Sequence, residues 1–144
     1  MDKQENLKIL QEIHTGAKMG MNSISFTLDK VENEDLKNDL TFQYNNYNDI
    51  LNKVNEQFMK HNEVPDESNM KDTVMTWTGI QLNTIKNKSN SHISDMLIQG
   101  TTMGVIEGRR ILNNNPNMDT EIKQILNNFI TMQENNIQRL KMYL

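Results

Sequence analysis

The sequence predicts an all-α protein, a four-helix bundle made of two helical hairpins with an extra helix in the crossover between them. The chain has 144 residues, with only 6 Gly and 2 Pro, too few for a turn-rich β-sandwich or barrel. Apolar residues recur at intervals of three and four, which is the helical repeat. The two ends of the chain also resemble each other, each reading as helix, turn and helix. A single domain over residues 1–144 suits this length.

The first hairpin is predicted over about residues 3–61. Asp2 and Glu5 have the spacing of a capping box at the start of its first helix. That helix continues along an apolar stripe that includes one histidine, His14. Asn33 is the predicted N-cap of the second helix. A short turn between two long helices makes them antiparallel neighbours, so we expect a helical hairpin.

The second half of the chain contains the crossover helix and the second hairpin. The crossover helix is predicted over about residues 69–87, where Trp77 is expected to anchor it on the bundle. The second hairpin is predicted over about residues 91–143. Asn115 followed by Pro116 has the pattern of an N-cap with proline at the first helical position, so the last helix is expected to begin there.

A weak internal repeat relates the two hairpins. Residues 40–46, LTFQYNN, match residues 130–136, ITMQENN, in the second helix of each hairpin. The match pairs a Gln-x-x-Asn in one hairpin with a Gln-x-x-Asn in the other. The same landmarks therefore occur in the same order in both halves, as expected for two related hairpins joined by a long crossover.

Glycines four residues apart mark the first helix of each hairpin: Gly16 and Gly20, then Gly100 and Gly104. Glycine inside a helix costs up to ~1 kcal/mol relative to alanine, so a compensating contact is expected. We interpret the glycines as sites where neighbouring helices pack closely. A notch for a ligand is the alternative interpretation.

The order of these features resembles the ferritin-like superfamily. The features are a first helix containing Gly16, a long second helix around Gln43, a central Trp77, and a second hairpin marked by Gly100. More closely, the pattern resembles a group of uncharacterised bacterial ferritin-like proteins, some of them linked to stress responses. The resemblance implies a ferritin-like four-helix bundle from a bacterium, and it implies no particular activity.

The iron ligands of that superfamily are missing from this sequence. Di-iron members use a Glu-x-x-His motif on each of two helices and a Glu from each of the others. This chain contains no Glu-x-x-His or Asp-x-x-His, and the corresponding places hold Gln43 with Asn46 and Gln133 with Asn136. The carbonyl oxygens of neutral amides are weak metal ligands, and they do not balance the charge of iron. We therefore predict no catalytic residues, no metal and no cofactor; whether the protein is an enzyme stays open, with the sequence favouring one that is not.

The candidate ligand-binding residues are the four amides of the two Gln-x-x-Asn motifs and a histidine and a glutamate on core-facing stripes, namely Gln43, Asn46, Gln133, Asn136, His14 and Glu107. A simpler interpretation accompanies two of them. His14 would be a core histidine hydrogen-bonded across the bundle. Glu107 would be a carboxylate at the rim, paired with a cation.

The charge and the composition of the chain indicate which classes of partner and which cellular location to expect. The chain has 15 basic and 19 acidic residues, a net charge of −4, which argues against a nucleic-acid partner. The absence of cysteine excludes disulfides and thiolate metal sites. No apolar run is long enough for a membrane span and the N-terminus does not read as a signal peptide, so a cytoplasmic location is expected.

Two functional hypotheses follow from the sequence. The first is a non-catalytic structural or protein-interaction module, with itself or another protein as partner. The second is a protein that binds a metal or a small ligand in a non-standard polar site formed by the four core amides. The sequence favours the first, because the helical pattern is strong and the metal ligands are missing.

Overall fold

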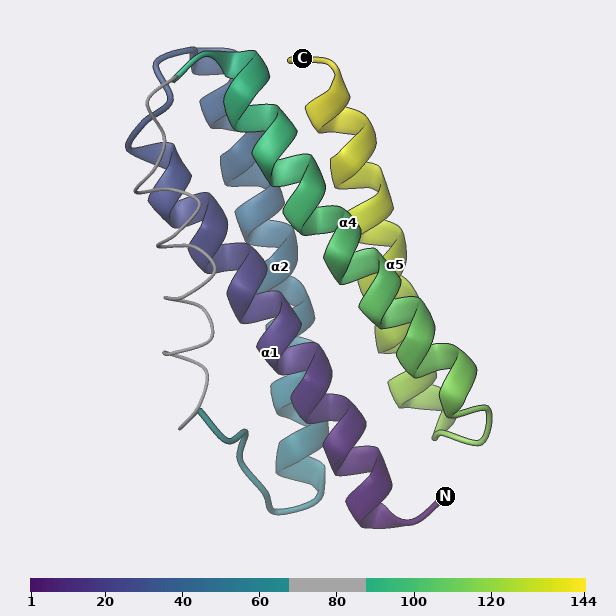
Figure 1. The fold of residues 1–144 in the computed structure, drawn as a ribbon. Coiled ribbons are helices and arrows are strands. Elements are labelled where there is room, and N and C mark those ends of the chain that lie inside the picture. Colours follow the sequence, from purple (N-terminus) through teal and green to yellow (C-terminus); the bar gives the residue numbers. More distant parts are fainter. Residues whose placement is uncertain (68–87) are drawn as a thin grey trace.

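The computed structural model describes residues 1–67 and 88–144, and within them the chain forms a bundle of four helices (Figure 1). The helices are α1 (Lys3–Leu28), α2 (Glu34–Lys60), α4 (Asn90–Asn114) and α5 (Thr120–Lys141). The predicted all-α bundle of two hairpins is confirmed. The predicted crossover helix over 69–87, with Trp77, lies outside the described residues.

Capping residues set the helix ends where the sequence indicates them. Asp2 and Glu5 form the predicted capping box, with Asp2 Oδ1 accepting from Glu5 N at 2.9 Å and Glu5 Oε2 accepting from Asp2 N at 3.1 Å. The side chain of Asn33 accepts from Leu36 N at 2.9 Å at the start of α2. Ser89 caps α4 in the same way. These bonds satisfy backbone N–H groups that have no partner inside the helix.

The start of the last helix differs from the prediction, because α5 begins at Thr120 and not at Pro116. Asn115 instead donates its side-chain amide to a carbonyl in the last turn of α4 at 2.8 Å, so it ends that helix. Met118 is buried, and the backbone N–H of Asp119 donates to an asparagine side chain of α1 at 3.2 Å. These contacts hold the turn against α1, and the new helix begins only after them.

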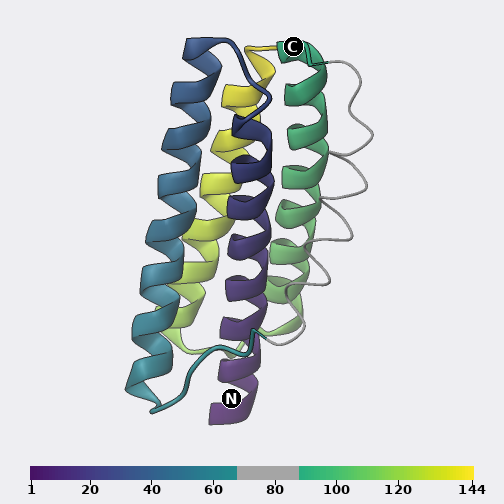
Figure 2. The same ribbon diagram turned by 90° about the vertical axis from the view of Figure 1, so that its left-hand side faces the viewer.

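The helices of each hairpin pack along their whole length, whereas α1 and α4 touch more sparsely. Figure 2 shows α1 between its hairpin partner α2 and its neighbour α4. Aliphatic side chains from all four helices fill the core, with Leu10, Leu40, Ile93 and Leu126 completely buried. The loose α1–α4 face is therefore the side of the bundle where space for a ligand can arise.

The helical glycines make room for side chains of neighbouring helices. A Cβ on Gly20 would lie 2.5 Å from the ring of Tyr47 on α2, and a Cβ on Gly104 would overlap Oε1 of Gln133 on α5. The expectation of helix backbones in close contact is therefore corrected at these positions. Gly20 and Gly104 each accommodate a side chain that the other helix of the same hairpin projects toward them.

Candidate functional site

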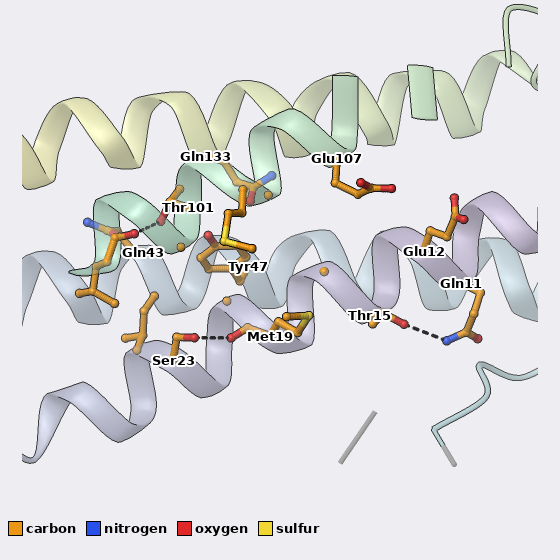
Figure 3. A pocket seen from close by; sticks show the side chains of 17 residues that line it. Gln11, Glu12, Thr15, Met19, Ser23, Gln43, Tyr47, Thr101, Glu107 and Gln133 are labelled. Carbon is orange, nitrogen blue, oxygen red and sulfur yellow. Dashed lines mark hydrogen bonds between the residues drawn. The ribbon is translucent and has the colours of Figure 1, made fainter. Parts of the chain in front are cut away.

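A cavity of about 420 Å³ lies between α1 and α4, and all four helices contribute to its wall (Figure 3). This volume is within the range of small-molecule binding sites. Apolar atoms dominate the wall, which includes two methionines and four glycines. The polar side chains of the described residues at the wall are Gln11, Glu12, Thr15, Ser23, Gln43, Tyr47, Thr101, Glu107 and Gln133.

Gln43 is held in a fixed orientation at one end of the cavity. It is 2% exposed, and its Nε2 donates to Oδ1 of Asp39 at 3.0 Å. Nε of Arg139 donates to the same carboxylate oxygen at 2.9 Å. Because an ionised carboxylate only accepts, the Gln43 amide nitrogen is committed to Asp39. One N–H of the amide is used in this way, and we interpret the carbonyl oxygen as the group that Gln43 offers to the cavity.

Gln133 carries a buried amide nitrogen that has no partner. The residue is 2% exposed, and its Nε2 makes no hydrogen bond within residues 1–67 and 88–144. Its Oε1 lies against Gly104. Leaving a buried donor unpaired costs about 1–3 kcal/mol, and such groups are rare in native proteins. An unpaired donor on a cavity wall is a position for a ligand's hydrogen-bond acceptor.

Tyr47 completes the uncharged end of the cavity. Burial raises the pKa of Tyr47 to about 12, although hydrogen bonding to Asn136 and Thr101 opposes that change. Its ring meets Phe129 edge-on, with 6.2 Å between the ring centroids. The phenol therefore stays protonated at neutral pH, and this end of the cavity presents only neutral groups.

Two carboxylates face each other at the opposite, outer end of the cavity, Glu12 from α1 and Glu107 from α4 (Figure 3). Burial raises the pKa of Glu12; nearby Lys8 opposes the rise and Glu107 adds to it. Glu107 also accepts from Nη1 of Arg110 at 2.7 Å. As expected from its pattern, Glu107 is an exposed carboxylate paired with a cation.

The structure brings together half of the predicted site. Three of the six candidates line the cavity: Gln43, Gln133 and Glu107. Asn46 lines a separate groove between α2 and α5. Asn136 is 1% exposed, and its Nδ2 donates to Sδ of Met132 at 3.1 Å. The four amides therefore do not form one pocket.

His14 lies away from this cavity and has a different partner from the one expected. It is 2% exposed, and its Nε2 lies 3.3 Å from Oε1 of Glu67 in the segment that follows α2. Gln11 holds the same segment against α1 through two hydrogen bonds to the backbone of Asp66, at 2.7 and 2.8 Å. The interpretation of a hydrogen bond across the bundle is corrected, because His14 bonds to the connection leaving α2.

The burial of His14 makes stability depend on pH. Desolvation lowers its pKa, while the hydrogen bond and the charge of Glu67 oppose this change and Lys18 adds to it. Since the unfolded chain binds this proton more readily, its contribution is complete above the ordinary pKa of about 6.5 and is lost as the pH falls. We expect the free energy of unfolding in urea to fall between pH 7 and pH 5. His14→Gln should weaken that dependence and His61→Gln should retain it; the same slope in His14→Gln would contradict the assignment.

Tyr47 and Glu12 are functional candidates that the sequence pattern does not single out. Tyr47 shares a core stripe with Gln43, one helical turn away, which is the only signal for it. Glu12 is an exposed acid of α1, and only the packing of α1 beside α4 brings it near Glu107. Among the residues described, no group of three or more His, Cys, Asp or Glu side chains could hold a metal ion. No helix of the described part is long and apolar enough to cross a membrane.

Comparisons with known proteins support the fold. No protein-family model matches the sequence, and no curated protein matches it. The structure is similar to that of the bacterioferritin-related protein from Bacteroides fragilis, described as a dodecameric thioferritin. The TM-score is 0.78 at 10% sequence identity, and the match covers 99% of this chain and 86% of that one. The chain therefore has the ferritin-like four-helix fold that its sequence pattern resembles.

Proposed function

We propose that this protein is a non-catalytic ferritin-like bundle that binds a small organic molecule in the cavity between α1 and α4. The observation that carries the proposal is Gln133, which lines a cavity of about 420 Å³ and whose buried Nε2 has no partner in the described part of the chain. A bound molecule with a hydrogen-bond acceptor would satisfy this donor. The proposal corresponds to the small-ligand form of the second hypothesis drawn from the sequence.

The glycines and methionines of the wall support the proposal. Gly16 and Gly20 on α1, and Gly100 and Gly104 on α4, all line the cavity. Gly20 and Gly104 make room for Tyr47 and Gln133, and both of these side chains line the cavity. Met19 and Met103 border the cavity, and flexible thioether side chains adapt to apolar ligands of varied shape.

Iron storage is the alternative that a ferritin neighbour raises, and the donor set argues against it. Gln43 and Gln133 are neutral amides, and the amide nitrogen of Gln43 is already bound to Asp39. The two carboxylates of the wall, Glu12 and Glu107, are exposed, and Glu107 is paired with Arg110. Iron prefers anionic oxygens and imidazoles, which these positions do not combine. We therefore propose that the ligand is organic.

Filling the cavity should abolish binding. The neutral apolar dye N-phenyl-1-naphthylamine is expected to gain fluorescence saturably with the full chain. Met19→Trp should weaken its affinity at least tenfold, because the larger side chain occupies the cavity. Met59→Trp is the matched control, since Met59 is 73% exposed and lies outside this cavity.

Two results would contradict the proposed function. One is an absence of saturable dye binding by the unmodified protein. The other is undiminished binding by Met19→Trp when circular dichroism shows that the variant is folded.

Self-association and a cytoplasmic location stay predictions. The neighbouring structure is described as dodecameric, which agrees with a homo-oligomer, and we propose that this chain also self-associates. Phe42 is an exposed aromatic side chain that supports this proposal. It is 48% exposed, and the guanidinium carbon of Arg139 lies 4.4 Å from the centre of its ring. Light scattering gives the mass in solution, and the mass of a single chain would contradict self-association.

A further inference from the structure

We infer that the cavity selects an uncharged, largely apolar molecule whose polar group is an amide, held between the Gln133 donor and the Gln43 acceptor. This inference rests on the proposed function and names the class of ligand. It uses three features of the wall: the orientation of Gln43, the orientation of Gln133 and the distribution of charge.

Gln43 supplies an acceptor whose orientation is fixed. Its Nε2 donates to Asp39 at 3.0 Å, and turning the amide around would place two acceptor oxygens against each other. Arg139 donates to the same carboxylate at 2.9 Å, which holds Asp39 in place. The carbonyl oxygen of Gln43 can therefore accept a hydrogen bond from a ligand N–H.

Gln133 supplies the donor. Its Oε1 lies against Gly104, where the missing Cβ leaves room for it. Its Nε2 has no partner in the described part of the chain. The wall thus offers one acceptor and one donor from facing hairpins. An amide carries the complementary pair, whereas a carboxylate has only acceptors and an ammonium group has only donors.

The charges of the wall disfavour an anion. The described residues that line the cavity include two carboxylates, Glu12 and Glu107, and no lysine, arginine or histidine. An anionic ligand would find no cation among these described wall residues and only neutral groups at the inner end.

A cation is also disfavoured. Arg110 is paired with Glu107 at 2.7 Å, and the positive charge of Lys8 favours the ionised form of Glu12. Nearby cations therefore already offset both carboxylates. At the inner end a charged group would lose its hydration without gaining an opposite charge, which is costly. An uncharged ligand avoids both penalties.

The test uses three eight-carbon probes that differ only in their polar group: octanamide, octanoate and octylammonium. Each competes with N-phenyl-1-naphthylamine for the full chain at pH 7. Octanamide is expected to bind at least tenfold more tightly than either charged probe. Gln133→Leu should lower the affinity for octanamide about tenfold relative to the affinity for the dye.

Gln57→Leu is the matched control, because Gln57 is also a buried glutamine but lies outside the cavity and donates to Glu121 at 2.9 Å. It should bind octanamide as the unmodified chain does. Without ligand, Gln133→Leu should unfold at the same urea concentration as the unmodified protein or a higher one, because the change removes an unpaired donor. A merely structural Gln133 would instead make that variant less stable.

The outcomes separate this inference from the proposed function. If the dye binds but octanoate or octylammonium competes as well as octanamide, the ligand class is overturned while the binding cavity stands. Unchanged octanamide affinity in Gln133→Leu would also overturn the class. If neither the dye nor any probe binds, the proposed function itself fails.

Discussion

Replacing Asp39 by alanine is expected to lower the free energy of unfolding by about 2–4 kcal/mol, one of the largest effects of a single polar side chain in this bundle. Asp39 is 9% exposed and joins α2 to the end of α5. Its carboxylate accepts from Arg139 at 2.9 Å, from Gln43 at 3.0 Å and from the hydroxyl of Tyr143 at 3.4 Å.

The size of the loss follows from what remains after the change. The amide of Gln43, 2% exposed, would be left without its acceptor in the interior. The Arg139 side chain is 43% exposed, so water partly compensates its lost partner. The expected cost is therefore below that of breaking a fully buried ion pair, which is about 3–5 kcal/mol.

Asp95→Ala is the matched control for this prediction. Asp95 accepts from Gln99 at 3.0 Å with the same spacing of four residues, but that pair is exposed. Its loss should cost less than about 0.5 kcal/mol. Urea unfolding of the three proteins gives the comparison, and equal losses for the two variants would show that Asp39 has no special role.

Asp39 also illustrates what the sequence could not predict. The helices follow from short-range signals, since a cap or an apolar stripe is contained within a few residues, and Asn33 and the Asp2 capping box are where the sequence places them. The role of Asp39 depends on Arg139, which is 100 residues away along the chain. No local pattern contains that contact.

The sequence predicts three of the six candidate residues correctly as residues of the cavity, and the other three depend on contacts that are distant along the chain. The apolar stripes correctly identify Gln43 and Gln133 as buried, because their positions follow the helical repeat. Moving three residues along places the next side chain about 60° around the helix, so Asn46 lies beside the position of Gln43 and is only half-buried. It then lines the groove between α2 and α5. Which face borders the cavity depends on how the two hairpins pack, and the sequence repeat carries no information about that.

Gly20→Ala is expected to lower the free energy of unfolding by about 2 kcal/mol, although alanine is the better helix former by up to ~1 kcal/mol. The new Cβ would lie 2.5 Å from two ring carbons of Tyr47. That ring has little freedom to move, because it is 3% exposed and packs edge-on against Phe129. Overpacking of a rigid side chain costs up to about 3 kcal/mol and therefore exceeds the gain in helix propensity.

Gly16→Ala is the control within the same helix. Its Cβ would meet Phe129 at 3.2 Å, a contact that a shift of a few tenths of an ångström relieves, so the net change should be near zero. The origin of the Gly20 effect can be tested by repeating the change in a Tyr47→Leu background. If the clash with the Tyr47 ring is the cause, Gly20→Ala should cost less there, because the two sites are coupled. An equal cost in both backgrounds would place the strain elsewhere and would show that the Tyr47 ring is not what requires glycine at position 20.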